Sequence, residues 1–203
     1  MIKKVLLFLT VFSSLSALSQ INYGVTTGLN ISRLNEEFKA VNGSFFNTSS
    51  MGLKLGMFSE IPINDKILLS PKLIYSQMGD RDKNYDSSRS LDASNIDYKL
   101  DYLTIPLNVR FFDKLYVEVG PQIGILINDS RESLDLGDLD SSIDIGANLE
   151  FGYKINDFRV GLNVYHGFTN VFEIEQTPPL SFRDLNIRNF ALSFNLNYIV
   201  FSN

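Results

Sequence analysis

The feature that most constrains this chain is an alternation of apolar and polar residues near its end. From residue 190 to residue 198, every second residue is large and apolar, and the residues between them are Ala191, Ser193, Asn195 and Asn197. A period of two places these sets on opposite faces of a β-strand. The segment therefore predicts a strand with one apolar and one polar face.

The same alternation recurs along the chain and predicts eight strands. Long connections, near 35–50, 79–97, 128–141 and 170–185, alternate with short ones near 62–65, 113–114 and 156–157. Glycines recur on the polar faces, as a narrow barrel interior requires. We expect an all-β fold, an eight-stranded antiparallel up-and-down transmembrane β-barrel with its apolar faces toward lipid. The expected strands are Ile21–Leu34, Met51–Ile61, Lys66–Met78, Tyr98–Phe112, Leu115–Ile127, Ser142–Lys154, Phe158–Thr169 and Asn186–Phe201.

The first 19 residues have the pattern of a secretory signal peptide. Lys3 and Lys4 precede an apolar run over residues 5–12, and Ala17 and Ser19 supply small residues for cleavage before Gln20. The apolar run is too short to span a bilayer as a helix. The sequence therefore predicts a signal peptide over 1–19 and a β-barrel domain over 20–203.

Charge and cysteine content exclude several classes of function. The chain carries 18 basic and 23 acidic residues, a net charge of −5, which becomes −7 when Lys3 and Lys4 are removed. An acidic chain of this kind argues against nucleic-acid binding, which needs basic patches. There is no cysteine, so disulfides and thiol chemistry are excluded.

The connection lengths predict how the barrel sits in the envelope. Outer-membrane barrels have short periplasmic turns and long external loops. We therefore expect a monomer in the outer membrane of a Gram-negative bacterium. Its surroundings would be outer-membrane lipid, with both termini in the periplasm and the long loops outside.

Charged residues of both signs are expected on the inner face. An eight-stranded barrel is only wide enough to be filled by side chains, and buried charges need partners. We interpret the set as a salt-bridge network that fills the lumen, with a narrow polar conduit as the alternative. The glutamates are network members in this interpretation, although paired carboxylates can also do acid–base chemistry. The set comprises Lys54, Glu60, Lys72, Arg110, Glu118, Glu150 and Arg159.

Few residues suggest catalysis or metal binding. His166 is the single histidine and is expected to face outward near the end of its strand. A serine–histidine pair in a lipid-modifying enzyme would need a nucleophile and an orienting group beside it, and no local motif supplies them. The acidic third loop, from Asp129 to Asp140, lacks the spacing of an EF-hand. We expect no catalytic residue, no metal and no cofactor.

Tyrosines on the strands are expected to form girdles at the membrane interfaces, where an amphipathic ring finds partners for both of its ends. The tyrosines concerned are Tyr23, Tyr75, Tyr102, Tyr116, Tyr153 and Tyr198.

Several segments resemble the PorT-like outer-membrane β-barrel family of Bacteroidota. The most specific are Leu100–Leu107 (LDYLTIPL) and Glu118–Gln122 (EVGPQ), supported by Met51–Pro62, Leu69–Gln77 and Gly167–Val171. The resemblance covers nearly the whole chain after the signal. It implies a small outer-membrane barrel, and the family's namesake is linked to type IX secretion. Barrel strands commonly finish on an aromatic residue, whereas this chain ends Phe201-Ser202-Asn203.

We interpret the chain as an integral outer-membrane barrel with a non-enzymatic role in the envelope or at the surface. It would bind a protein partner through its external loops, or serve protein secretion. The alternative is a soluble periplasmic or secreted barrel with its apolar residues around a small apolar ligand. A third reading, a lipid-modifying enzyme, depends on His166.

Overall fold

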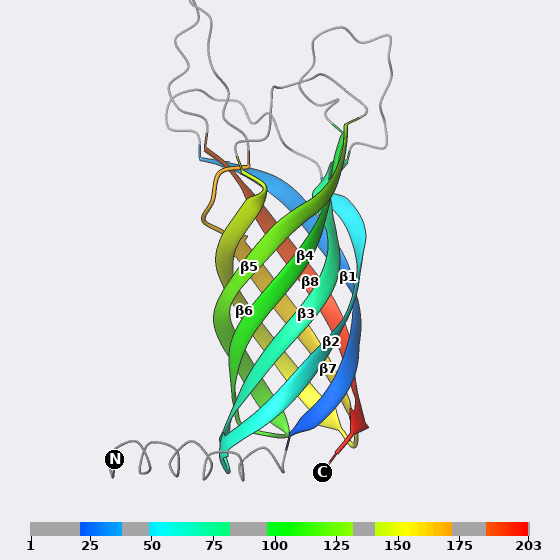
Figure 1. Ribbon diagram of the computed structural model, residues 1–203, viewed down its shortest axis with the longest axis vertical. Coiled ribbons are helices and arrows are strands. Elements are labelled where there is room, and N and C mark those ends of the chain that lie inside the picture. The colour runs from blue at the N-terminus through cyan, green and yellow to red at the C-terminus, as the bar shows by residue number, and fades with distance from the viewer. Residues whose placement is uncertain (1–20, 38–48, 82–96, 132–140, 172–185, 203) are drawn as a thin grey trace, which may run out of the picture.

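Eight antiparallel strands form a closed barrel in the computed structural model of the protein (Figure 1). The structure describes residues 21–37, 49–81, 97–131, 141–171 and 186–202. The predicted signal peptide over 1–19 and most of each long connection lie outside these residues. The strands are β1 (Asn22–Glu37), β2 (Ser50–Asn64), β3 (Ile67–Arg81), β4 (Asp97–Phe111), β5 (Leu115–Arg131), β6 (Ile143–Ile155), β7 (Phe158–Gly167) and β8 (Asn186–Phe201).

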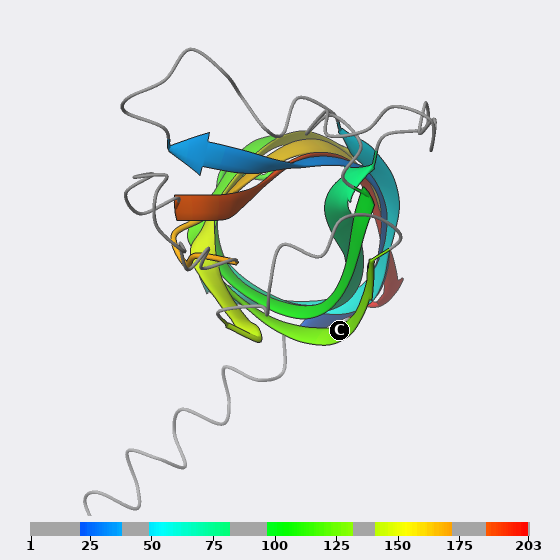
Figure 2. The same cartoon turned by 90° about the horizontal axis from the view of Figure 1, so that it is seen from above.

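The first and last strands close the ring, as the view from above shows (Figure 2). β1 pairs with β8 from Tyr23↔Phe201 to Glu37↔Asn186, and each other strand pairs with its neighbours in the sequence. Closure gives every strand a partner on both sides, which hydrocarbon demands because it offers no hydrogen bonds to a free edge. The predicted fold class is confirmed. No helix among the described residues is long and apolar enough to cross a membrane.

Apolar side chains cover the outside of the barrel. Leu55 and Met57 of β2 are 63% and 61% exposed, whereas Lys54 and Phe58, on either side of them in the same strand, are buried. We call this surface the outer belt. It also includes Val25, Leu29, Ile31, Leu53, Val119, Ile123, Ile145, Leu149, Phe151, Leu162, Val164, Leu192, Phe194 and Leu196. A barrel built to hold an apolar ligand would have the opposite arrangement, so that alternative does not match these faces.

The short connections lie together at one end of the barrel, which we call the turn end (Figure 1). β2–β3 turns at Asp65 and Lys66, β4–β5 at residues 112–114, and β6–β7 at Asn156 and Asp157. Phe112 and Asn156 adopt positive φ angles of 67° and 55° to make the tight reversals. The strand ends that lead into the long connections lie at the opposite end, the loop end.

Three strands extend three or four residues further toward the loop end than the alternation predicts. β1 continues to Glu37, β3 to Arg81 and β5 to Arg131, where the expected ends were Leu34, Met78 and Ile127. The backbone ladder continues to Arg81↔Asp97 and Tyr98↔Arg131. The apolar pattern stops earlier because the outer face changes to polar residues before the strand pairing ends.

Candidate functional site

The seven charged residues predicted to face inward are all buried in the barrel, none being more than 9% exposed. Six strands contribute them, because each strand turns its polar set toward the axis. We call them the charged network: Lys54 and Glu60 from β2, Lys72 from β3, Arg110 from β4, Glu118 from β5, Glu150 from β6 and Arg159 from β7.

Arg110 of β4 lies between two carboxylates, that of Glu118 on the adjacent strand β5 and that of Glu60 on β2. Its Nε donates to Glu118 Oε1 at 2.6 Å, its Nη2 forms an ion pair with the same oxygen, and its Nη1 donates to Glu60 Oε1. The Tyr116 ring lies 4.7 Å from the Arg110 guanidinium carbon. The N–H groups of the planar guanidinium therefore bind two carboxylates, and its face lies over an aromatic ring.

Glu60 of β2 binds residues of two strands that are not its neighbours in the barrel. Besides Arg110 of β4, it accepts a hydrogen bond from Arg159 Nη2 of β7 at 2.9 Å, and Arg159 Nη1 lies 2.8 Å from its other oxygen. Glu60 is fully buried. One carboxylate thus balances two buried guanidinium groups, and the pairing crosses the lumen rather than following one ladder.

Lys72 binds the two remaining glutamates. Its Nζ is 2.7 Å from Glu118 and 3.6 Å from Glu150. Glu150 also accepts hydrogen bonds from the Tyr116 hydroxyl at 2.9 Å and from Asn195 Nδ2 at 2.7 Å. Each glutamate of the network is therefore held by a cation and by further donors. Such carboxylates are structural acceptors and are poorly placed to take a proton from a substrate.

Lys54 differs from the other cations of the network. Within the described part of the chain, no carboxylate oxygen lies within 4.0 Å of its Nζ, which donates only to Ser193 Oγ at 3.5 Å. The network thus holds four cations, Lys54, Lys72, Arg110 and Arg159, against three carboxylates.

Polar side chains, most of them uncharged, fill the interior between the charged network and the loop end. Asn30 donates to Ser76 Oγ at 2.8 Å, and its amide oxygen accepts from Ser193 at 2.6 Å. Asn189 of β8 donates to Tyr102 Oη at 3.1 Å and to the buried carboxylate of Asp144 at 2.9 Å. Sequence reasoning did not single out these residues, because an isolated asparagine or serine carries no motif.

The loop end of the interior is closed by apolar side chains. We call this group the apolar cluster: Leu34, Met78, Tyr98, Leu100, Tyr102, Tyr165, Val171, Ile187 and Ala191. Tyr98, Leu100 and Ile187 are fully buried. These apolar residues face inward and so break the rule that apolar means outward. The signal that could have found them is an inverted alternation near the strand ends, where polar residues such as Lys99 and Arg188 occupy the outward positions and apolar residues lie between them.

Two of the tyrosines predicted for the interfacial girdles are inside the barrel instead. Tyr102 is 1% exposed and Tyr116 is fully buried, whereas Tyr23 and Tyr153 are 51% and 43% exposed on the outside. The prediction was wrong for Tyr102 and Tyr116 because both belong to the inward set of their strands. Gly152 and Gly161 leave room for Tyr116, since a Cβ at either position would collide with its ring or hydroxyl.

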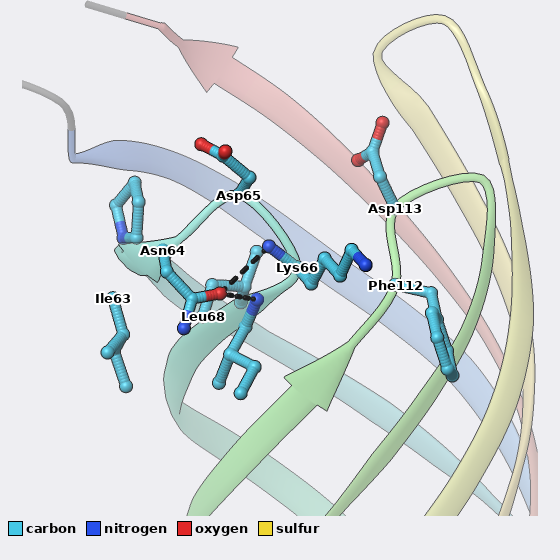
Figure 3. Close-up of a pocket in the computed structure, with 9 residues that line it drawn as sticks. Ile63, Asn64, Asp65, Lys66, Leu68, Phe112 and Asp113 are labelled. Carbon is cyan, nitrogen blue, oxygen red and sulfur yellow. Dashed lines mark hydrogen bonds between the residues drawn. The ribbon is translucent and has the colours of Figure 1, made fainter.

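A pocket of about 470 Å³ lies at the turn end, between the β2–β3 and β4–β5 turns (Figure 3). Asn64 Oδ1 accepts hydrogen bonds from the backbone N–H groups of Lys66 and Ile67, both at 2.9 Å, and Phe112 N–H donates to Lys66 O at 2.8 Å. Its charged groups, Asp65, Lys66 and Asp113, are exposed and of both signs. The pocket therefore offers no pre-organised charge to a ligand.

The remaining candidates for chemistry are placed as follows. The His166 ring contacts the Phe168 and Phe190 rings on the outer face, with centroid separations of 5.7 and 6.4 Å. Among the described residues, no group of three or more histidine, cysteine, aspartate or glutamate side chains could hold a metal ion. Most of the acidic third loop lies outside the residues that the structure describes.

The chain matches the model of the outer membrane protein beta-barrel domain over residues 12–173. No curated protein sequence matches the chain. Among solved structures, the chain is similar to neisserial surface protein A (NspA), with 14% identity over 87% of this chain and 96% of that one and a TM-score of 0.51. It is also similar to Ail, the attachment invasion locus protein of Yersinia pestis (10% identity, 89% and 99% coverage, TM-score 0.41).

The likeness to NspA, at low identity, concerns the fold alone. It agrees with the closed eight-stranded ring. The family match extends over most of the chain and includes β1 to β7. It is broader than the PorT-like assignment, which stays a prediction. The chain therefore belongs to the outer membrane protein beta-barrel domain family.

Proposed function

We propose that this protein is a non-conducting, non-enzymatic outer-membrane barrel that acts on a partner through the segments at its loop end. The observation that carries the proposal is the filled interior. The charged network, the neutral polar side chains and the apolar cluster follow one another from the turn end to the loop end. A lumen occupied in this way leaves the outside of the barrel as the place where it can act.

Four segments join the strands at the loop end: 38–49, 82–96, 132–142 and 168–185. The second is rich in both charges, with Asp82, Lys83, Asp86, Arg89 and Asp92. Polar connections of this length on a rigid scaffold are common binding elements. We propose that they meet a protein partner outside the cell. Service to a secretion complex, the role linked to the namesake of the PorT-like family, is one form of this role.

The absence of enzymatic activity is part of the proposal. The three network glutamates are engaged by cations, and the His166 ring lies against two phenylalanine rings. A hydrolase triad would need a nucleophile hydrogen-bonded to that imidazole. An assay for release of acyl chains from membrane lipid, with His166→Ala as the comparison, tests this part.

Conductance tests the filled lumen. Purified protein in a planar bilayer should give no stable single-channel steps. The double variant Leu34→Ser and Leu100→Ser should raise the frequency of openings, because it removes two buried members of the apolar cluster. Stable steps from the unaltered protein would show an open lumen and contradict the proposal.

The orientation of the barrel is tested by labelling single introduced cysteines. The chain contains no cysteine of its own, so only the introduced one reacts. We propose that the loop end faces outward and that both chain ends are periplasmic. A cysteine introduced at Ser88 should react with a membrane-impermeant maleimide on intact cells, and one at Asp157 in the β6–β7 turn should react only after the outer membrane is opened. The reverse pattern would overturn the orientation.

A further inference from the structure

An outward-facing row of cationic and aromatic side chains crosses three strands near the loop end. Arg33 of β1 is paired with Phe190 of β8, and Phe190 is paired with His166 of β7. The Arg33 guanidinium carbon lies 5.0 Å from the Phe190 ring centroid. The His166 ring meets Phe190 and Phe168 edge to face, at interplanar angles of 65° and 69°. We call these four residues the rim cluster.

The rim cluster lies at the edge of the outer belt. On each of the three strands, the residue two positions closer to the turn end is apolar and also faces outward. These residues are Ile31, Leu192 and Val164, which are 48%, 41% and 36% exposed and form a continuous apolar row. Strand residues two positions apart differ in height by about 7 Å along the strand. The rim cluster therefore occupies the level where hydrocarbon gives way to lipid headgroups, which is also where aromatic side chains are favoured.

The described side chains of this part of the outer wall include cations and no carboxylate, and β1 continues beyond them to Glu36 and Glu37. Residues 21–34, 158–171 and 187–202, which supply the described side chains of β1, β7 and β8, contain no aspartate or glutamate. The face of Arg33 rests on Phe190, and its N–H groups make no hydrogen bond to a described residue. A guanidinium held by a ring on one face keeps its donor edge available for a planar or tetrahedral oxyanion.

We propose that the rim cluster binds the phosphate of a membrane-lipid headgroup. Arg33 supplies the charge and a pair of N–H donors, and the His166 ring can add one more donor. Phe168 and Phe190 fix both groups at the boundary and pack against the upper part of the lipid chains. The ligand is a lipid rather than a free ion because the phosphate site adjoins the apolar row that would receive the acyl chains.

The test uses the full-length protein purified from membranes in a maltoside detergent, which contains no phosphate. Binding is measured by calorimetry with dioctanoyl phosphatidic acid, with dioctanoylglycerol, which lacks the phosphate, and with inorganic phosphate. The variants are Arg33→Gln and, as the matched control, Lys99→Gln. Lys99 is another exposed cation near the loop end, on β4.

Phosphatidic acid should bind the unaltered protein, and Arg33→Gln should weaken binding by about tenfold, because a charge-assisted pair of hydrogen bonds is lost. Lys99→Gln should change it by less than about twofold, since that site lacks a flanking ring and a second donor. If Arg33→Gln does not fold, Arg33→Lys replaces it, with an expected loss of about threefold because the charge stays and the fork is lost.

Three results would overturn the proposal: equal effects of the Arg33 and Lys99 variants, equal binding of dioctanoylglycerol, or binding of inorganic phosphate as tight as that of the phospholipid. The last would indicate a site for a free anion. None of these measurements depends on conductance or on the loop partner, so the rim cluster and the proposed function fail separately.

Discussion

The two ends of the lumen differ in what fills most of the space. Toward the turn end, four cations and three carboxylates are buried together, and each carboxylate has at least one cation within 4.0 Å. Toward the loop end, Leu34, Leu100 and Ile187 pack in an apolar cluster, and the carboxylates of Asp80, Asp101 and Asp144 are also buried in this part of the barrel. The charged network specifies which strands lie opposite each other, because removing one partner leaves another buried charge unpaired. The apolar cluster excludes water without demanding particular partners.

This difference predicts unequal responses to substitution. Buried ion pairs are strongly coupled, so their loss is severe when one partner remains. Apolar contacts are lost in proportion to the atoms removed and to the cavity left behind. Variants in the two regions therefore test whether the interior is held mainly by pairing or mainly by packing.

The largest effect is expected for Glu60→Gln. The change keeps the side-chain volume but leaves Arg110 and Arg159 without their shared carboxylate, and such a loss costs about 3–5 kcal/mol in buried pairs. Urea unfolding of the barrel in detergent micelles measures it. The control is Lys154→Gln, which breaks an exposed pair with Asp113 and should cost less than about 1 kcal/mol. Similar losses in the two variants would remove the distinction between network and surface pairs.

In the apolar cluster, Leu100→Ala should destabilise the barrel by about 2–4 kcal/mol, because the fully buried side chain leaves a cavity. Leu55→Ala is the matched control. Leu55 is 63% exposed on the outer belt, where lipid or detergent can fill the space. A smaller loss for Leu100→Ala than for Leu55→Ala would show that the cluster contributes little to stability.

Packing inside the charged network is tested by Gly152→Ala. A Cβ at this position would collide with the Tyr116 ring, and overpacking of this kind costs about 1–3 kcal/mol. Gly124→Ala is milder, because its Cβ would lie 3.3 Å from Tyr102 Cδ1 at the closest. The midpoints of thermal unfolding, followed by the gel mobility of heated samples, should rank Gly124→Ala above Gly152→Ala. The opposite ranking would mean that Tyr116 can move aside.

The smallest effect is expected for Lys54→Met. Since no carboxylate lies within 4.0 Å of Lys54 Nζ among the described residues, removing the charge should change stability by less than about 1 kcal/mol or raise it. Lys72→Met, which unpairs Glu118 and Glu150, should be clearly destabilising. Equal losses in the two lysine variants would show that Lys54 is paired in solution.

The sequence predicted the strands and their faces well wherever lipid fixes the pattern. Along β8, from Phe190 to Tyr198, the alternation is complete because one side meets hydrocarbon and the other a polar lumen. Tyr102 and Tyr116 were assigned to the interfaces on residue type alone, whereas alternation places them inward. The inward charges were also identifiable by alternation.

The partners within the interior were not predictable. Arg159 pairs with Glu60 across 99 residues of sequence, a contact that depends on strand register and on the stagger of the closed ring. The bulge between Asp101 and Tyr102 shifts the pairing of β4 with β5, and no glycine at these positions indicates it in the sequence. The apolar cluster was missed because the rule that places apolar residues outside holds only at the depth of the bilayer.

The pairing of β1 with β8 has a consequence for how the protein is made. The strand synthesised first finds one of its two neighbours only when residues 186–201, the strand synthesised last, have been produced. Until then both edges of the growing sheet are open, and neither can be left facing hydrocarbon. Assembly in the membrane must therefore wait for the whole polypeptide or proceed under the protection of another protein, and a chain cut before β8 should never leave that protected state.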